Sequence, residues 1–160
     1  MTIALGADDA AVDLKNLIKS YLESQGIEVT DYGVHNSAPS LYPDIAAEVA
    51  LAVSAHKHDR AILFCGTGLG MAITANKIPG IRAATCHDTY SAERARKSND
   101  AQILTMGSRV IGPELAKSVV EAWLHSEFQG GGSAAKVDRI MEYEKQYLKS
   151  EDRADGKGGS

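Results

Sequence analysis

The chain has 160 residues, of which 44% are hydrophobic and 24% charged, values typical of one globular domain rather than a collagen, a coiled coil or a disordered chain. A net charge of −4 argues against a general nucleic-acid binder, and no apolar run approaches the roughly 20 residues of a membrane helix. The N-terminus lacks the basic segment of a secretion signal, so Cys65 and Cys86 are expected to be free thiols in a reducing, cytoplasmic compartment.

Short apolar runs, typical of buried strands, alternate with apolar residues at helical spacing. In chain order these patterns predict a strand over 2–6, a helix from about 10 to 25, a strand over 27–31, a helix around 45–53, a strand over 60–65, a helix over 71–78, a strand over 81–86, a helix over 90–98, a strand over 103–106, a helix from 113 and a last helix over 134–149. Strands separated by helices indicate an α/β domain with a parallel sheet between two helical layers.

Three consecutive glycines, 130–132, separate the last predicted helix from the alternating core. We expect this helix to dock on a neighbouring subunit, with packing on its own domain as the alternative. Residues 1–150 are expected to form a single domain. The tail 151–160 is polar and glycine-rich, and we expect it to be disordered.

In an open parallel sheet, ligands bind beyond the carboxyl ends of the strands, so the residues that follow each strand are candidate site residues. After the third strand, Gly66, Gly68 and Gly70 alternate with larger residues, and glycine lets backbone amides face an anion. Cys65 precedes them, and a thiol beside a helix N-terminus is a usable base or nucleophile. The alternatives are a tightly packed turn and a buried cysteine that acts as a small hydrophobic residue.

The other strand ends also carry polar residues. Asp8 and Asp9 follow the first strand, and one of them is expected to cap the next helix, which leaves the other to bind hydroxyl groups or move a proton. Arg109 follows the fifth strand, where a surface ion pair is the alternative to a ligand contact. Cys86 is interpreted as a core residue and His87 as a hydrogen-bonded residue. No set of His, Cys, Asp and Glu has the spacing of metal ligands.

Several longer motifs point to one family. They are GADD over 6–9, YPD over 42–44, FCGTGLGM over 64–71, ANKIPGIRA over 75–83, CHDTYSA over 86–92, SNDA over 98–101 and GSRVIG over 107–112. Together they resemble the type B ribose-5-phosphate isomerase family, which also contains the galactose-6-phosphate isomerase subunits. The resemblance covers nearly the whole predicted domain, from about Thr2 to about Tyr147.

The resemblance implies a metal-independent aldose–ketose isomerase of sugar phosphates without a cofactor. It further implies a Rossmann-like fold with a five-stranded parallel sheet, and a homodimer or tetramer whose sites are built from two subunits. Cys65 would move the proton between C1 and C2, and Thr67 would assist ring opening. The implied substrate-binding residues are Asp8, Asp9, Gly66, Thr67, Gly68, Leu69, Gly70, Asn99, Arg109 and Lys136. Among these, the backbone amides of 66, 68, 69 and 70 would hold the enediolate oxygens, and Arg109 the phosphate.

The sequence departs from the family pattern at four positions. Asp9 and Ser98 stand where the family has histidines, the second of which opens the sugar ring, and Gly132 and Lys136 stand where it has phosphate-binding arginines. Ribose 5-phosphate is expected as the substrate on family grounds, with Asp9 or His87 opening its ring. A tetrose 4-phosphate is the alternative, because its O4 carries the phosphate and it cannot close a five-membered ring. A non-catalytic sugar-phosphate sensor is the alternative of another class.

Overall fold

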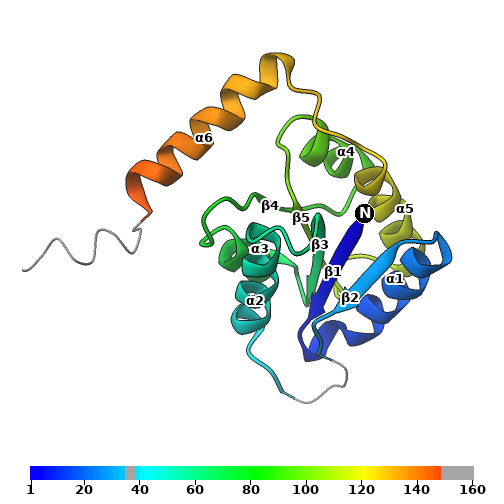
Figure 1. The fold of residues 1–160 in the computed structure, drawn as a ribbon. Coiled ribbons are helices and arrows are strands. Elements are labelled where there is room, and N and C mark those ends of the chain that lie inside the picture. The colour runs from blue at the N-terminus through cyan, green and yellow to red at the C-terminus, as the bar shows by residue number, and fades with distance from the viewer. Residues whose placement is uncertain (35–38, 149–160) are drawn as a thin grey trace, which may run out of the picture.

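The computed structural model describes residues 1–34 and 39–148, and one five-stranded sheet lies within them. Its strands are β1 (Thr2–Ala7), β2 (Glu28–Asp31), β3 (Arg60–Cys65), β4 (Ala83–Thr85) and β5 (Ile103–Gly107). Every neighbouring pair is parallel, and the order across the sheet is β2-β1-β3-β5-β4 (Figure 1).

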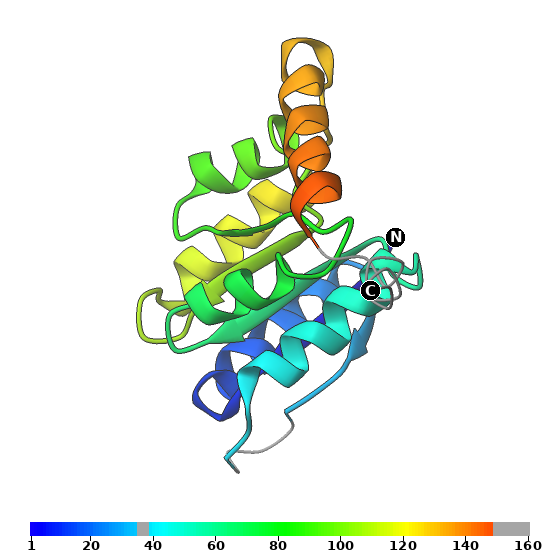
Figure 2. The same cartoon turned by 90° about the vertical axis from the view of Figure 1, so that its left-hand side faces the viewer.

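Helices cover both faces of this sheet (Figure 2). They are α1 (Val12–Ser24), α2 (Tyr42–Ser54), α3 (Leu69–Ala75), α4 (Thr89–Lys97) and α5 (Pro113–Leu124), and a further helix, α6 (Ala134–Tyr147), follows them in the chain. Helices α1, α4 and α5 enclose the larger core cluster, which contains Trp123, and α2 and α3 enclose the second, which contains Met71. The expected three-layer Rossmann-like fold is confirmed.

The register of the central strands places the candidate site residues at one edge. Strand β3 is buried along its whole length between β1 and β5, as expected for a strand covered on both faces. Ala7 of β1 pairs with Phe64, and Cys65 pairs with Gly107 of β5. The loops that follow these three strands therefore leave the sheet side by side.

The predicted elements all occur, with shifted ends. Helix α3 begins at Leu69 and ends at Ala75, although the pattern predicted residues 71–78. The amide side chain of the next residue, Asn76, donates to the Ala83 carbonyl at 2.9 Å and accepts from the Ala83 N–H at 2.8 Å. These two bonds turn the chain toward β4, so the helix stops before the apolar run does.

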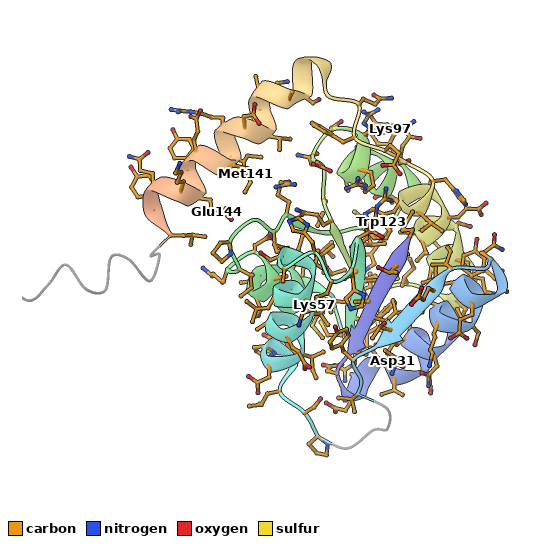
Figure 3. All side chains as sticks on the ribbon, viewed as in Figure 1. Asp31, Lys57, Lys97, Trp123, Met141 and Glu144 are labelled. Atoms are coloured by element: carbon orange, nitrogen blue, oxygen red, sulfur yellow. The ribbon has the colours of Figure 1, made fainter. Side chains whose placement is uncertain are left out.

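Helix α6 extends away from the sheet and its two helical layers (Figure 1). On α6 only Val137 is buried. Two contacts tie its inner face to the loop before β4: the Glu144 carboxylate accepts from Gly80 N–H at 3.0 and 3.2 Å, and Arg82 Nη1 lies 3.1 Å from the Met141 sulfur. Figure 3 shows Met141 and Glu144 on that face. The tail 151–160, predicted to be disordered, lies outside the described residues.

Within the part of the chain that the structure describes, no helix is long and apolar enough to cross a membrane.

Candidate active site

The loop after β3 wraps its backbone around the Cys65 thiol. The Gly68 N–H donates to Cys65 Sγ at 3.0 Å, and the sulfur-bearing residue is only 5% exposed. The Cys65 carbonyl accepts from Ser108 N–H at 2.9 Å, which joins this loop to the one after β5. The thiol is thus fixed at the start of the glycine-rich loop, at the carboxyl edge of the sheet.

Two glycines let this loop lie close to β5. Gly68 has a φ of +80°, and a Cβ there would lie 2.8 Å from the Met106 carbonyl carbon. A Cβ on Gly107 would lie 2.5 Å from the Thr67 Cα. The Thr105 hydroxyl supports the arrangement by donating to the Gly68 carbonyl at 2.8 Å. The turn is therefore tightly packed and also lies at the carboxyl edge of the sheet, so the two sequence interpretations are compatible.

Two of the four amides expected to hold enediolate oxygens have partners inside the loop. Gly68 N–H is directed at the Cys65 sulfur, and Leu69 N–H donates to Thr67 Oγ1 at 3.2 Å. The Thr67 hydroxyl accepts that bond and keeps its own proton to donate. The family resemblance assigned Thr67 to ring opening, and in this geometry the bond with Leu69 leaves the hydroxyl proton unused.

One of the two aspartates after β1 caps the following turn, as expected, and it is Asp8. Asp8 Oδ1 accepts from Ala10 N–H at 3.0 Å and caps the short 3₁₀ turn over Asp9–Ala11, which leads into α1. Burial raises the pKa of the Asp8 carboxyl, an effect opposed by the Ala10 bond and by the nearby Arg109 charge. Asp9 takes no part in the cap, and its Oδ1 lies 3.5 Å from Ser40 Oγ.

Arg109 lies beside the cysteine loop. Its backbone N–H donates to the Gly66 carbonyl at 3.0 Å, and a Cβ on Gly66 would lie 3.4 Å from Arg109 Nη1. Its side chain is exposed. The structure thus brings together Cys65, the glycine loop, Asp8 and Arg109, which places a thiol, oxygen donors and a cation at one edge of the sheet.

His87 and Cys86 behave as the sequence suggested. His87 Nε2 accepts from Gly107 N–H at 2.8 Å, and burial lowers the pKa of the imidazole. Because Nε2 is the acceptor, the neutral ring carries its proton on Nδ1. Cys86 is buried in the core, and its burial raises the pKa of the thiol to about 11.

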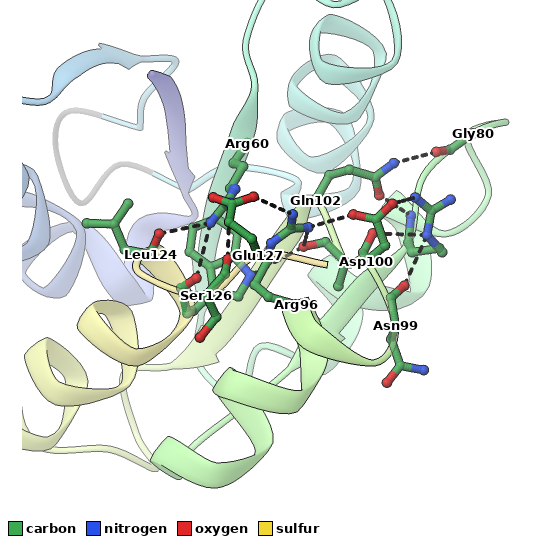
Figure 4. Close-up of polar contacts among 12 residues, drawn as sticks. Arg60, Gly80, Arg96, Asn99, Asp100, Gln102, Leu124, Ser126 and Glu127 are labelled. Atoms are coloured by element: carbon green, nitrogen blue, oxygen red, sulfur yellow. Dashed lines mark hydrogen bonds and ion pairs between the residues drawn. The ribbon is translucent and has the colours of Figure 1, made fainter. Parts of the chain in front are cut away.

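Asn99 and Lys136 do not join the other candidates within one chain. Asn99 lies between α4 and β5, at the amino edge of the sheet, and a strand such as β5 spans roughly 16 Å. Its carbonyl accepts from Arg82 Nε at 3.2 Å, while Figure 4 shows its side chain directed away from the polar network around Arg96 and Asp100. Lys136 is exposed in the first turn of α6. Asn99 therefore lies at the opposite edge of the sheet from Cys65.

One charged residue that the sequence analysis did not single out lies near Asn99. Arg94 Nε donates to Ser98 Oγ at 2.9 Å across one turn of α4. The spacing of four residues on a predicted helix was the signal that could have found this pair. Among residues 1–34 and 39–148, no group of three His, Cys, Asp or Glu side chains is placed to hold a metal ion.

Comparison with known proteins places this arrangement in a family. The model of the Ribose/Galactose Isomerase family matches residues 3–140. The chain is 58% identical over 147 residues to a D-erythrulose-4-phosphate isomerase of Pectobacterium atrosepticum, covering 91% of this chain and 97% of that protein. It is 57% identical over 142 residues to a ribose-5-P isomerase B of Listeria innocua, covering 89% and 96%. The solved ribose-5-phosphate isomerase B of Clostridium thermocellum superposes with a TM-score of 0.90 at 48% identity, covering 92% and 99%.

Proposed function

Because the chain belongs to the ribose/galactose isomerase family and is an aldose–ketose isomerase of phosphorylated sugars, we propose that its substrate is a tetrose 4-phosphate, the erythrose 4-phosphate and erythrulose 4-phosphate pair. Ribose 5-phosphate, which the sequence placed first, is the second candidate. Close relatives carry names for both substrates, so the choice between them depends on the residues of this chain.

The observation that carries the choice is the missing ring-opening acid. Ser98 stands at the position that the family resemblance assigns to that acid, and its hydroxyl accepts from Arg94. His87, one of two proposed substitutes, has its Nε2 bonded to Gly107 N–H. A furanose needs a proton donor at its ring oxygen, whereas a tetrose 4-phosphate arrives open. The site suits a substrate that needs no ring opening.

Asp9 is what keeps ribose 5-phosphate as a candidate. It is left out of the cap that occupies Asp8, and it lies at the same edge as Cys65. A carboxyl group in this position can carry a proton to a ring oxygen. If it does, the lost histidine is replaced within the chain itself.

In the proposed mechanism, the Cys65 thiolate removes the proton from C2 of the aldose. The C2–H bonding electrons form the C1–C2 double bond of an enediolate, and the negative charge moves to O1. The Thr67 hydroxyl and the glycine-loop amides hold the two oxygens. A proton moves from O2 to O1, and the thiol then returns its proton to C1 to give the ketose. Arg109 contributes one of the cations that bind the phosphate in this scheme.

We also propose that two copies of the chain build each site. The expected binding residues Asn99 and Lys136 lie away from the edge that carries Cys65, and α6 leaves a groove of about 780 Å³ beneath it. Leu69 and Ile73 of α3 are 56% and 62% exposed beside the cysteine loop. A second copy that inserts this α3 face into the groove covers these side chains and completes the site.

The direct test is a panel of erythrose 4-phosphate, ribose 5-phosphate and galactose 6-phosphate, with aldose–ketose conversion followed by NMR. We expect the highest kcat/KM for erythrose 4-phosphate. A higher kcat/KM for ribose 5-phosphate would contradict the proposed substrate, and turnover of none of the three would contradict the proposed activity on these sugars.

A further inference from the structure

Arg94 is held in a defined orientation without being neutralised. Its Nε donates to Ser98 Oγ at 2.9 Å, while its Nη1 lies 3.6 Å from Glu93 Oε1. Both members of the latter pair are about one-third exposed, and Glu93 is shared with Lys97 at 3.5 Å, so the pair is weak. Among the described residues, the two Nη nitrogens of Arg94 make no hydrogen bond.

Arg94 lines the groove beneath α6 together with Asn99. The other arginine that lines it, Arg82, is engaged: its Nε donates to the carbonyls of Asn99 and Asp100, its Nη2 to the Asp100 carboxylate, and its Nη1 to the Met141 sulfur. Of the two guanidinium groups in the groove, that of Arg94 is therefore the one whose two Nη nitrogens make no hydrogen bond among the described residues. A guanidinium fork matches a phosphate through two parallel N–H···O bonds.

We propose that Arg94 binds the substrate phosphate in the site of the neighbouring copy, with Ser98 as the residue that positions it. The inference rests on the proposed function, and it accounts for a serine at position 98. With C1 and C2 held at Cys65, O4 is a hydroxyl or ring oxygen in a pentose 5-phosphate but bears the phosphate in a tetrose 4-phosphate. An acid beside O4 would therefore assist ring opening of the pentose phosphate, whereas a cation beside O4 would bind the phosphate of the tetrose.

In this proposal Arg94, positioned by Ser98, also replaces the cation that is missing at Gly132, where the family pattern has an arginine. The Gln129 N–H donates to the Lys97 carbonyl at 3.2 Å, so the segment that leads to Gly132 lies beside the end of α4. Gly132 offers no side chain to an anion there. Arg94 supplies a guanidinium from α4 instead, and a phosphate bound nearer to C2 needs a cation nearer to the reacting carbons.

The test is Arg94→Gln, with Lys97→Gln as the matched control on the same helix. We expect Arg94→Gln to raise KM for erythrose 4-phosphate by about 10- to 100-fold, the usual effect of losing charged hydrogen bonds, with a smaller effect on kcat. Calorimetry with inorganic phosphate should show a parallel loss of affinity. Lys97→Gln should change neither, because Lys97 does not line the groove.

Two further variants test the positioning role of Ser98. Ser98→Ala removes the acceptor of the Arg94 bond and should raise KM a few-fold at unchanged kcat, whereas Ser98→Thr keeps the hydroxyl and should restore KM. Unchanged phosphate affinity in a folded Arg94→Gln protein, or a wild-type protein that binds no phosphate, would overturn the proposal. Loss of phosphate affinity in Arg94→Gln without turnover of any sugar phosphate by wild type would reject the proposed function and leave the anion site standing.

Discussion

The backbone N–H of Gly68 donates to the Cys65 sulfur at 3.0 Å, so the candidate base and the glycine loop form one unit. Both depend on the path of the chain after β3. A substitution at position 65 therefore replaces two things at once: the acceptor of the Gly68 N–H and the atom proposed to remove the substrate proton. Substitutions at Cys65 and at Gly68 separate the effect on catalysis from the effect on folding.

Cys65→Ser should lower kcat by roughly 10²- to 10⁴-fold, the contribution typical of a general base, because a serine hydroxyl is a far weaker base than a thiolate. Steady-state kinetics with the preferred substrate measures this. Cys86→Ser is the control, since Cys86 is buried in the core and its raised thiol pKa keeps it protonated. Near-normal turnover by Cys65→Ser would show that another group moves the proton.

Gly68→Ala tests the close approach of the cysteine loop to β5. An alanine at a φ of +80° is strained, and its Cβ would lie 2.8 Å from a backbone carbon of Met106. We expect a loss of roughly 3 kcal/mol or more in the free energy of unfolding, measured by urea titration. Gly26→Ala is the matched control, because Gly26 has a φ of +76° but a Cβ at that position would have no atom within 4 Å, so a loss of about 1 kcal/mol is expected. Equal losses would show that the contact with β5 is unimportant.

Much of this molecule follows from its sequence. The buried run over Arg60–Cys65 is apolar enough to require a central strand, and the alternation of such runs with helical stripes requires parallel pairing. A cap by one of the two aspartates after β1 was likewise predictable from the residue type and its place at a strand end, and the structure shows that Asp8 is the one that caps.

Contacts across the fold could not be predicted in the same way. Nothing local indicates that His87 holds the Gly107 N–H, since the two residues meet only when β4 and β5 lie together. The end of α3 at Ala75 depends on Asn76 bonding to Ala83, a pairing that hydrophobic periodicity does not report. The distance of Asn99 from the cysteine edge follows from the direction of α4, which motifs alone do not reveal.

The stability of the protein should fall as the solution becomes acidic, in part through His87. Burial lowers its pKa below the ordinary value of 6.5, and the neutral ring accepts the Gly107 N–H. The unfolded chain therefore binds a proton at His87 more readily than the folded protein does. The contribution of neutral His87 to the free energy of unfolding is complete above about pH 6.5 and is lost as the pH falls from there toward the lower folded-state pKa. Urea titrations at about pH 7.5 and about pH 5.5, on either side of the ordinary histidine pKa, measure the difference. His87→Gln keeps an acceptor but does not titrate, and it should lose less stability over this interval than wild type; an equal loss would assign the effect to other groups.

Removal of residues 134–160 should abolish dimerisation and weaken substrate binding. It deletes α6, whose side chains Ile140, Tyr143 and Tyr147 are 47%, 50% and 69% exposed in a single chain, together with Lys136. Sedimentation velocity and KM measure the two effects. Removal of 151–160 alone is the control and should change neither. A truncated protein that remains dimeric and fully active would place the subunit interface elsewhere.

Ser98→His should move the substrate preference from the tetrose toward the pentose phosphate. The imidazole supplies a proton donor for the ring oxygen of ribose 5-phosphate and removes the hydroxyl that holds Arg94. Ring opening precedes proton abstraction, so the gain should appear in kcat/KM for ribose 5-phosphate, while kcat/KM for erythrose 4-phosphate should fall as Arg94 loses its orientation. We expect the ratio of the two values to shift by about 10-fold or more. Ser98→Ala removes the hydroxyl without adding an acid, so it should lower the erythrose 4-phosphate value and leave the ribose 5-phosphate value unchanged. An unchanged ratio in Ser98→His would mean that position 98 does not face O4, and Asp9→Asn would then be the variant that locates the ring-opening acid.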